Sequence, residues 1–243
     1  MRHNPAPYAL VIFDLDGTLV DSFPWFLRVV NDVAREFNFR PIANDDIARL
    51  RRAGARAILK HLELPLWKVP RIAAHLRRMK RAHLGELPLF PGVPGMLDAL
   101  RSNGIRIALV SSDSEANARL QLGDSAVHFS DFACGASLFG KAAKFRRIVG
   151  RAGIPPPAAI AIGDEMRDMD AANAAGIAFG GVAWGYADPD ALRARQPQAW
   201  FDTVADIPRM LTARGLTAKG TTETDVATCV RPHVAGNGRG SIP

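Results

Sequence analysis

The feature that most constrains the fold is an alternation of short apolar runs and helical stretches that begins after Phe90-Pro91-Gly92. It predicts helices over 93–102, 114–122, 141–152 and 168–175, with strands over 105–110, near 132, and over 159–162 and 178–182. An earlier apolar run, 8–13 (YALVIF), is typical of a strand that is buried on both faces. Strands that alternate with helices are joined by right-handed crossovers. The expected fold is therefore an α/β, Rossmann-like parallel sheet.

A helical segment interrupts this alternation directly after the first strand. Apolar residues recur at helical spacing from Phe26 to Phe37, and residues 22–88 contain no convincing strand. We expect a core domain of residues 1–21 and 89–213, with a small helical cap domain, 22–88, inserted after the first strand. Residues 214–243 lack periodicity and large apolar side chains, which predicts a disordered tail.

The cap segment carries the excess positive charge of the chain. The chain has 31 Lys and Arg against 24 Asp and Glu, and residues 22–88 hold 14 of the basic and 6 of the acidic side chains. A basic module of this kind suits an anionic ligand, either a small phosphate or carboxylate or a nucleic acid backbone. A solvated surface rich in arginine would have the same composition, and both interpretations stay open here.

Nothing in the sequence predicts a membrane span or a secreted protein. No stretch approaches the roughly 18 apolar residues that cross a bilayer, and the N-terminal residues do not resemble a signal peptide. Cys134 and Cys229 are far apart and belong to no CxxC or Cys/His cluster. The cysteines therefore predict neither a disulfide framework nor a zinc site, as is typical of a reducing, cytoplasmic setting.

Two carboxylates follow the first predicted strand, in the sequence Asp14-Leu15-Asp16-Gly17-Thr18. Ligands of open parallel sheets bind outside the carboxyl ends of the strands. On an extended strand Asp14 and Asp16 would point to one face, where their repulsion favours a bound cation or a shared proton. Gly17 permits a tight turn that could aim backbone N–H groups at an anion. Carboxylates with a substrate phosphate are the ligands that Mg²⁺ prefers.

Further polar side chains occur where other predicted strands end or helices begin. They are Ser111 and Ser112, Lys141 and Lys144, and Asp164, Glu165 and Asp168. A nucleophilic carboxylate, a metal site, a hydroxyl donor and a fixed ammonium are what phosphoryl transfer to a carboxylate requires.

In order and spacing these residues resemble the four motifs of the haloacid dehalogenase (HAD) superfamily: Asp14-x-Asp16-Gly-Thr, Ser111, Lys141, and Gly163-Asp164-x-x-x-Asp168. The resemblance covers about residues 8–212, and the helical insertion resembles the small cap of that superfamily. The segments LDGTLVDS, GDEMRDMDAANAAG and GVAWGY are most similar to its phosphoglycolate phosphatase-like branch.

The resemblance implies a Mg²⁺-dependent phosphatase that hydrolyses a small phosphate monoester through an aspartyl-phosphate. Asp14 would be the nucleophile and Asp16 the acid and base, while Ser111 and Lys141 would contact the phosphoryl group. Mg²⁺ would be held by Asp14, the backbone carbonyl of Asp16, and Asp164. Asp168 would position the metal or Lys141, and Gly17, Thr18 and Ser112 would support the site.

Several alternatives stay open from the sequence alone. Lys144 could replace Lys141, and Glu165 could approach the metal. A sugar-phosphate mutase would need the same core, and a phosphonate hydrolase would need an imine-forming cap lysine, for which Lys60 and Lys68 are candidates. A binding module on an inactive phosphatase core, with a nucleic acid or a protein as its partner, is the alternative from a different class.

The cap contains a cluster of arginines around Gly54 that could select the substrate. Helices are predicted from Asn44 and over about 54–62 and 66–84. On a helix Arg49 and Arg52 would share a face, as would Arg52 and Arg56. We expect these three, Arg52 above all, to bind the anionic leaving group of a small phosphorylated metabolite such as 2-phosphoglycolate. Neither the exact substrate nor the oligomeric state can be derived from the sequence.

Overall fold

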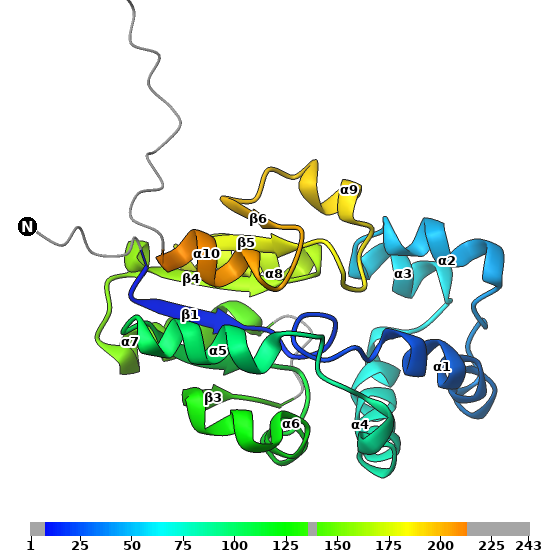
Figure 1. Ribbon diagram of the computed structural model, residues 1–243. Helices are drawn as coiled ribbons and strands as arrows, with labels where there is room; N and C mark the ends of the chain where they lie inside the picture. Colours follow the sequence, from blue (N-terminus) through cyan, green and yellow to red (C-terminus); the bar gives the residue numbers. More distant parts are fainter. Residues whose placement is uncertain (1–7, 136–139, 213–243) are drawn as a thin grey trace, which may run out of the picture.

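The computed structural model describes residues 8–135 and 140–212 and has the expected α/β architecture, a parallel sheet between two layers of helices (Figure 1). The sheet has the strand order β3-β2-β1-β4-β5-β6, and every neighbouring pair is parallel. Its strands are β1 (Leu10–Phe13), β2 (Arg106–Val110), β3 (Phe129–Ala133), β4 (Ala159–Gly163), β5 (Ala178–Val182) and β6 (Ala199–Phe201).

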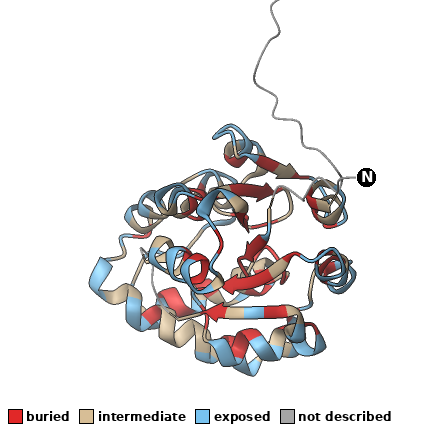
Figure 2. Ribbon diagram, turned by 90° about the vertical axis from the view of Figure 1, so that its left-hand side faces the viewer, coloured by how far each residue is buried: buried red, intermediate tan, exposed pale blue. Residues whose placement is uncertain are grey.

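Alternate residues of the central strand β1 build the two halves of the hydrophobic core. Val11 and Phe13 pack on one face of the sheet, whereas Leu10 and Ile12 pack on the other. The first face is covered by α5 (Val93–Ser102), α6 (Glu115–Leu122) and α10 (Asp206–Thr212). The second is covered by α7 (Lys141–Ala152), α8 (Met166–Ala175) and α9 (Pro189–Arg193). All four side chains are buried, and the strands form the most buried layer in Figure 2. This is why the sequence of β1 shows an unbroken apolar run.

The predicted strands and helices from Val93 to Val182 are confirmed, and no predicted end shifts by more than two residues. Three elements beyond Val182 were not predicted: α9, β6 and α10. They have five, three and seven residues, which is too short for a helical or a strand period to repeat. Short 3-10 turns occupy Gly123–His128 and Pro156–Ala158.

The insertion after β1 is helical throughout, as expected. It contains α1 (Phe23–Phe37), α2 (Asn44–Arg51), α3 (Ala55–His61) and α4 (Val69–Ala82), with 3-10 turns at Leu66–Lys68 and Leu84–Glu86. The chain leaves the core at Val20 and returns at Leu89, and these two residues pair in an antiparallel bridge. The bridge holds the two connections together, and Figure 1 shows the cap beyond the carboxyl end of β1.

The shared helix face that was expected for Arg52 and Arg56 does not form. α2 ends at Arg51, Gly54 has an extended backbone (φ −73°, ψ 159°), and α3 begins at Ala55. Glycine is a poor helix former, and here it separates the two helices. Arg52 and Arg56 therefore do not share a helix face.

Two further expectations concern the ends of the chain and the membrane. The tail predicted over 214–243 lies outside the described residues. Within the ranges 8–135 and 140–212, no helix is both long enough and apolar enough to span a bilayer.

Candidate active site

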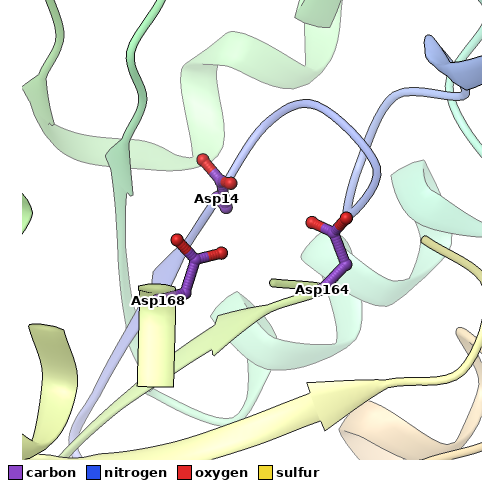
Figure 3. A group of neighbouring side chains, drawn as sticks. All are labelled: Asp14, Asp164 and Asp168. Carbon is purple, nitrogen blue, oxygen red and sulfur yellow. The ribbon is translucent and has the colours of Figure 1, made fainter. Parts of the chain in front are cut away.

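Three buried carboxylates meet at the carboxyl edge of the sheet (Figure 3). Asp14 follows β1, Asp164 follows β4, and Asp168 lies in the first turn of α8. One carboxylate oxygen from each lies within 4.8 Å of the others, and no residue of the three is more than 6% exposed. β1 and β4 pair in the sheet, and this pairing brings Asp14 and Asp164 together although they are 150 positions apart in the chain.

Lys141, at the start of α7, is the lysine that contacts this cluster. Its Nζ lies 2.9 Å from Asp14 Oδ2 and 2.5 Å from Asp168 Oδ1. Lys144 instead donates to the backbone carbonyls of Ser111 and Gly135. The structure therefore places Lys141, and not Lys144, beside the carboxylates.

The electrostatics of the cluster leave negative charge unbalanced. Burial raises the pKa of Asp14 to about 6, although Lys141 acts to lower it. Burial, with Glu165 and Asp14 nearby, raises the pKa of Asp164 well above its ordinary value. Burial acts to lower the pKa of Lys141, but Asp14 and Asp168 outweigh it and raise that pKa. One ammonium among three buried carboxylates makes this a site that favours a further cation.

The donor set fits a divalent cation of the magnesium type. The Oδ2 atom of Asp168 is buried and has no hydrogen-bond partner among the residues that the structure describes. An unpaired buried carboxylate oxygen is costly, and a cation would satisfy it. Asp14, Asp164 and Asp168 offer the hard oxygen ligands that Mg²⁺ prefers. The carboxylate of Asp16, expected near Asp14, is not part of this cluster.

Asp164 is held in place by groups that the first motif and a later loop supply. The Thr18 hydroxyl donates to Asp164 Oδ1 over 2.9 Å, and the backbone N–H of Tyr186 donates to Oδ2 over 2.7 Å. Gly17 has a positive φ of 76°, and a Cβ at this position would lie 2.3 Å from Asp164 Oδ2. We had expected the turn at Gly17 to aim backbone N–H groups at an anion. The Gly17 N–H instead donates to the Val20 carbonyl. Glycine is required here mainly because Asp164 occupies the space.

Ser111 lies where the sequence predicts it, at the end of β2. It is buried, and its hydroxyl accepts a hydrogen bond of 3.0 Å from the Asp113 N–H. Ser111, Ser112 and Lys141 border one cavity of about 630 Å³, and Arg56 borders the same cavity. The hydroxyl and the ammonium that were expected to contact a phosphoryl group therefore face a common space.

A lysine of the cap, Lys80, was missed by the sequence analysis. Its Nζ, on α4, lies 2.6 and 2.8 Å from the two carboxylate oxygens of Asp16 and 2.8 Å from Asp113 Oδ2. Burial acts to lower the pKa of Lys80, but Asp16 and Asp113 outweigh it and raise the pKa. Asp14 and Asp16 thus have a lysine each, one from the core and one from the cap, instead of sharing a proton. In the sequence Lys80 is one of several basic residues on α4, and only its burial distinguishes it.

The cap arginines occupy three different environments. Arg49 pairs with Asp46, and Arg52 pairs with Asp188; both guanidinium groups are largely exposed. Of the three, only Arg56 borders a cavity beside Ser111 and Lys141. Outside the cap, Arg167 of α8 acts to lower the pKa of Asp14 and pairs with Glu165 over 2.6 Å. That pairing gives Glu165 a partner outside the three carboxylates.

A parallel α/β core with buried carboxylates and a lysine at its carboxyl edge, covered by a helical insertion, defines a hydrolase of the HAD type. The family model described as "Haloacid dehalogenase-like hydrolase" matches residues 11–182. The chain belongs to this family.

Relatives and solved structures agree with this assignment. A phosphoglycolate phosphatase of Synechococcus elongatus is 35% identical over 83% of this chain and 96% of its own length. A 5'-nucleotidase of Pseudomonas aeruginosa is 26% identical over 87% of this chain and 99% of its own. The crystal structure of a predicted phosphoglycolate phosphatase from Haemophilus somnus superposes with a TM-score of 0.66 at 25% identity, covering 84% of this chain and 98% of that one. The expected fold, the phosphatase class and the similarity to the phosphoglycolate phosphatase-like branch are confirmed.

Proposed function

We propose that the protein is a Mg²⁺-dependent phosphatase that hydrolyses a small phosphate monoester through an aspartyl-phosphate on Asp14. The observation that carries the proposal is the buried cluster of Asp14, Asp164 and Asp168 with Lys141 at hydrogen-bond distance. Phosphoglycolate is the first substrate to test, because two similar proteins are named phosphoglycolate phosphatase.

In the first half of the reaction Asp14 attacks phosphorus, and the bond to the leaving oxygen breaks. Asp16 gives its proton to that oxygen, so that an alcohol departs. Ser111 and Lys141 border one cavity, and from there they would stabilise the charge that develops on the phosphoryl oxygens. Asp14 and Asp164, with Asp168 and the backbone carbonyl of Asp16, would hold a Mg²⁺ ion, which would supply a Lewis acid when bound.

In the second half Asp16 takes a proton from water, and the water oxygen attacks phosphorus. The bond between Asp14 and phosphorus breaks, which releases inorganic phosphate and restores both carboxyl groups. For this role Asp16 needs a fixed position, and the two hydrogen bonds from Lys80 supply it.

The alternative reactions find less support in the cap. The Lys68 ammonium donates to the carbonyls of Phe37 and Asn38, away from the carboxylates, and Lys60 is exposed. Lys80 does contact Asp16, but its raised pKa keeps it protonated, whereas an imine-forming lysine must lose its proton. The mutase alternative shares every core residue and is separated from a phosphatase by assay alone.

A direct test traps the covalent intermediate. Protein is incubated with phosphoglycolate or nitrophenyl phosphate and Mg²⁺, quenched with hydroxylamine, digested and analysed by mass spectrometry. We expect a hydroxamate on Asp14 and inorganic phosphate as the product, with both lost in EDTA. Turnover without any hydroxamate, or with a phosphorylated sugar as the only product, would contradict the proposal.

The cap arginines remain proposed substrate ligands. We expect phosphoglycolate to be hydrolysed faster than ethyl phosphate, and we expect Arg56→Ala to reduce this preference. Loss of a hydrogen bond to a charged group costs about 1.5–3 kcal/mol. Arg49→Ala and Arg52→Ala, which remove surface ion pairs, test the two remaining arginines. If the wild type hydrolyses phosphoglycolate and ethyl phosphate equally fast, none of the three arginines binds the anionic leaving group.

The remaining expectations are proposals of the same kind. We propose that the protein binds a small phosphorylated metabolite rather than a membrane or a nucleic acid, and that it acts in the cytoplasm.

A further inference from the structure

The cap helices and the adjoining edge of the core border an open cavity. This cavity of about 490 Å³ lies among all four cap helices, and most of its lining is apolar. Phe26 and Val30 of α1, Leu50 of α2, Ile58 of α3, and Ile72 and Leu76 of α4 are among the side chains that border it. The three clustered carboxylates, Asp14, Asp164 and Asp168, do not border this cavity.

The polar end of the cavity is formed by catalytic residues. Asp16 and Lys80 border it, together with Asp113 and Arg167. Asp16 has to reach the oxygen that leaves phosphorus, so the body of the leaving alcohol lies on the Asp16 side of the phosphoryl group. That side is the apolar cavity.

Several cap side chains that border the cavity are incompletely buried or lack a hydrogen-bond partner among the described residues. α3 has no buried residue, although Ile58 and Leu59 are apolar, and both of them are half-buried against the cavity. Trp25 is only 5% exposed and borders the cavity, and its Nε1 has no hydrogen-bond partner among the described residues. Buried indole N–H groups ordinarily find an acceptor. A ligand that carries an oxygen could provide it.

The size of the cavity exceeds what a two-carbon acid would fill. A cavity of about 150 Å³ holds a benzene molecule, and ligand pockets typically span about 300–1,000 Å³. The volume in the cap thus matches an apolar group with on the order of ten carbon atoms.

We infer that the cap cavity binds the alcohol portion of the substrate, and that the preferred substrates are monophosphates of alcohols with a bulky, largely apolar body. This inference rests on the proposed phosphatase function and names its substrate class. Phosphoglycolate would then be accepted as a small substrate that leaves the cavity mostly empty.

A series of linear alkyl phosphates from ethyl to dodecyl, each kept below its micelle concentration, tests the inference. All are esters of primary alcohols, so their intrinsic reactivity is nearly constant and only the apolar length changes. We expect kcat/KM to rise by about threefold to fourfold for each buried methylene, and to level off once the cavity is full. A flat or falling profile, with ethyl phosphate still hydrolysed, would overturn the inference and leave the phosphatase proposal intact. No hydrolysis of any ester or of nitrophenyl phosphate would instead overturn the proposed function.

Two neighbouring alanines of α4 provide a matched pair of variants. Ala73 borders the cavity, whereas Ala74 is half-buried and does not border it. In Ala73→Leu, kcat/KM should level off at a shorter alkyl group than in the wild type. The difference should be about the number of carbon atoms that leucine adds to the alanine side chain. Ala74→Leu should leave the profile unchanged. Equal effects of both variants, or no effect of either, would contradict the location of the binding site.

A binding measurement keeps the test independent of turnover. Decylphosphonate, which has no ester bond, should bind the protein more tightly than ethylphosphonate in calorimetry with EDTA present. Ala73→Leu should weaken the binding of decylphosphonate, whereas Ala74→Leu should not. Equal affinity of the wild type for the two phosphonates would overturn the inference.

Discussion

At the scale of single residues, Asp14 combines its proposed role as the nucleophile with an electrostatic cost. Its carboxylate is buried, and its pKa is raised to about 6, so the charged form that the reaction needs is disfavoured in the metal-free protein. A carboxyl group with a raised pKa stabilises the fold below its unfolded pKa, and this contribution is lost as the pH rises through about 6.

Asp14→Asn should therefore abolish turnover without unfolding the protein. Removal of a nucleophile costs about 10⁴-fold or more in rate. Because asparagine carries no charge, the melting temperature of the metal-free variant relative to the wild type should increase between pH 5 and pH 8. Residual wild-type activity, or a relative melting temperature that falls over this range, would contradict the role or the electrostatics.

Asp16→Asn should fail in a different manner, because acid assistance depends on the leaving group. General acid–base catalysis contributes about 10²–10⁴-fold. We expect a loss of this size for an alkyl phosphate and a much smaller loss for the first half-reaction of nitrophenyl phosphate, whose phenolate needs no proton to depart. Single-turnover kinetics measures that step separately. Equal losses for both substrates would argue against the assignment of the acid.

At the scale of elements, Lys80 joins α4 of the cap to the core. It bridges Asp16, after β1, to Asp113, after β2, and Asp113 is only 2% exposed. Asn117 holds the other oxygen of Asp113 over 2.9 Å. The cap is thus attached to the active site through a buried ion pair as well as through its two connecting segments.

Lys80→Met should destabilise the protein strongly, because it leaves Asp113 and Asp16 without their cation. Removal of one partner of a buried ion pair costs about 3–5 kcal/mol. Denaturant unfolding of the metal-free variant measures this cost, and Lys60→Met, at an exposed lysine of the same cap, is the control. Adding Asp113→Asn to Lys80→Met should recover part of the loss. A cost no greater than that of Lys60→Met would mean that the bridge contributes little.

At the scale of the whole molecule, the proposed Mg²⁺ ion would link stability to catalysis. A ligand that binds only the folded state stabilises it by about 2.7 kcal/mol at one hundred times its Kd. We expect Mg²⁺ to raise the melting temperature of the wild type and of Asp170→Asn, which removes an exposed carboxylate of α8. Asp164→Asn should lose this response. A full response of Asp164→Asn would place the cation elsewhere.

The affinity for Mg²⁺ should also depend on pH in a defined direction. Protons compete with metal ions for carboxylates. Because burial raises the pKa of Asp14 to about 6 and raises the pKa of Asp164 as well, the Kd for Mg²⁺ should increase as the pH falls from 8 to 5. Titration calorimetry across this range measures the trend. The same Kd at pH 5 and pH 8 would contradict it.

Local sequence was sufficient to predict the core and the polar residues that gather at its carboxyl edge. The apolar run before Asp14 and the strand and helix periods up to Val182 are properties of neighbouring residues. Functional groups that follow strands of one parallel sheet necessarily gather at one edge. Asp14, Ser111, Lys141 and Asp164 could thus be assigned to one site before any coordinates were known.

The tertiary structure alone decided what the cap contributes. Lys80 is distinguished from the other basic residues of α4 by its burial against Asp16 and Asp113, and these contacts depend on how the cap sits on the core. Helical periodicity shows which side chains share a face, but it does not show what that face meets or whether packing leaves a cavity. The arginines around Gly54 illustrate the same limit, since a break between α2 and α3 sends Arg52 to Asp188 while Arg56 borders the site. Contacts between distant segments depend on packing across the whole chain, and patterns within one segment do not encode them.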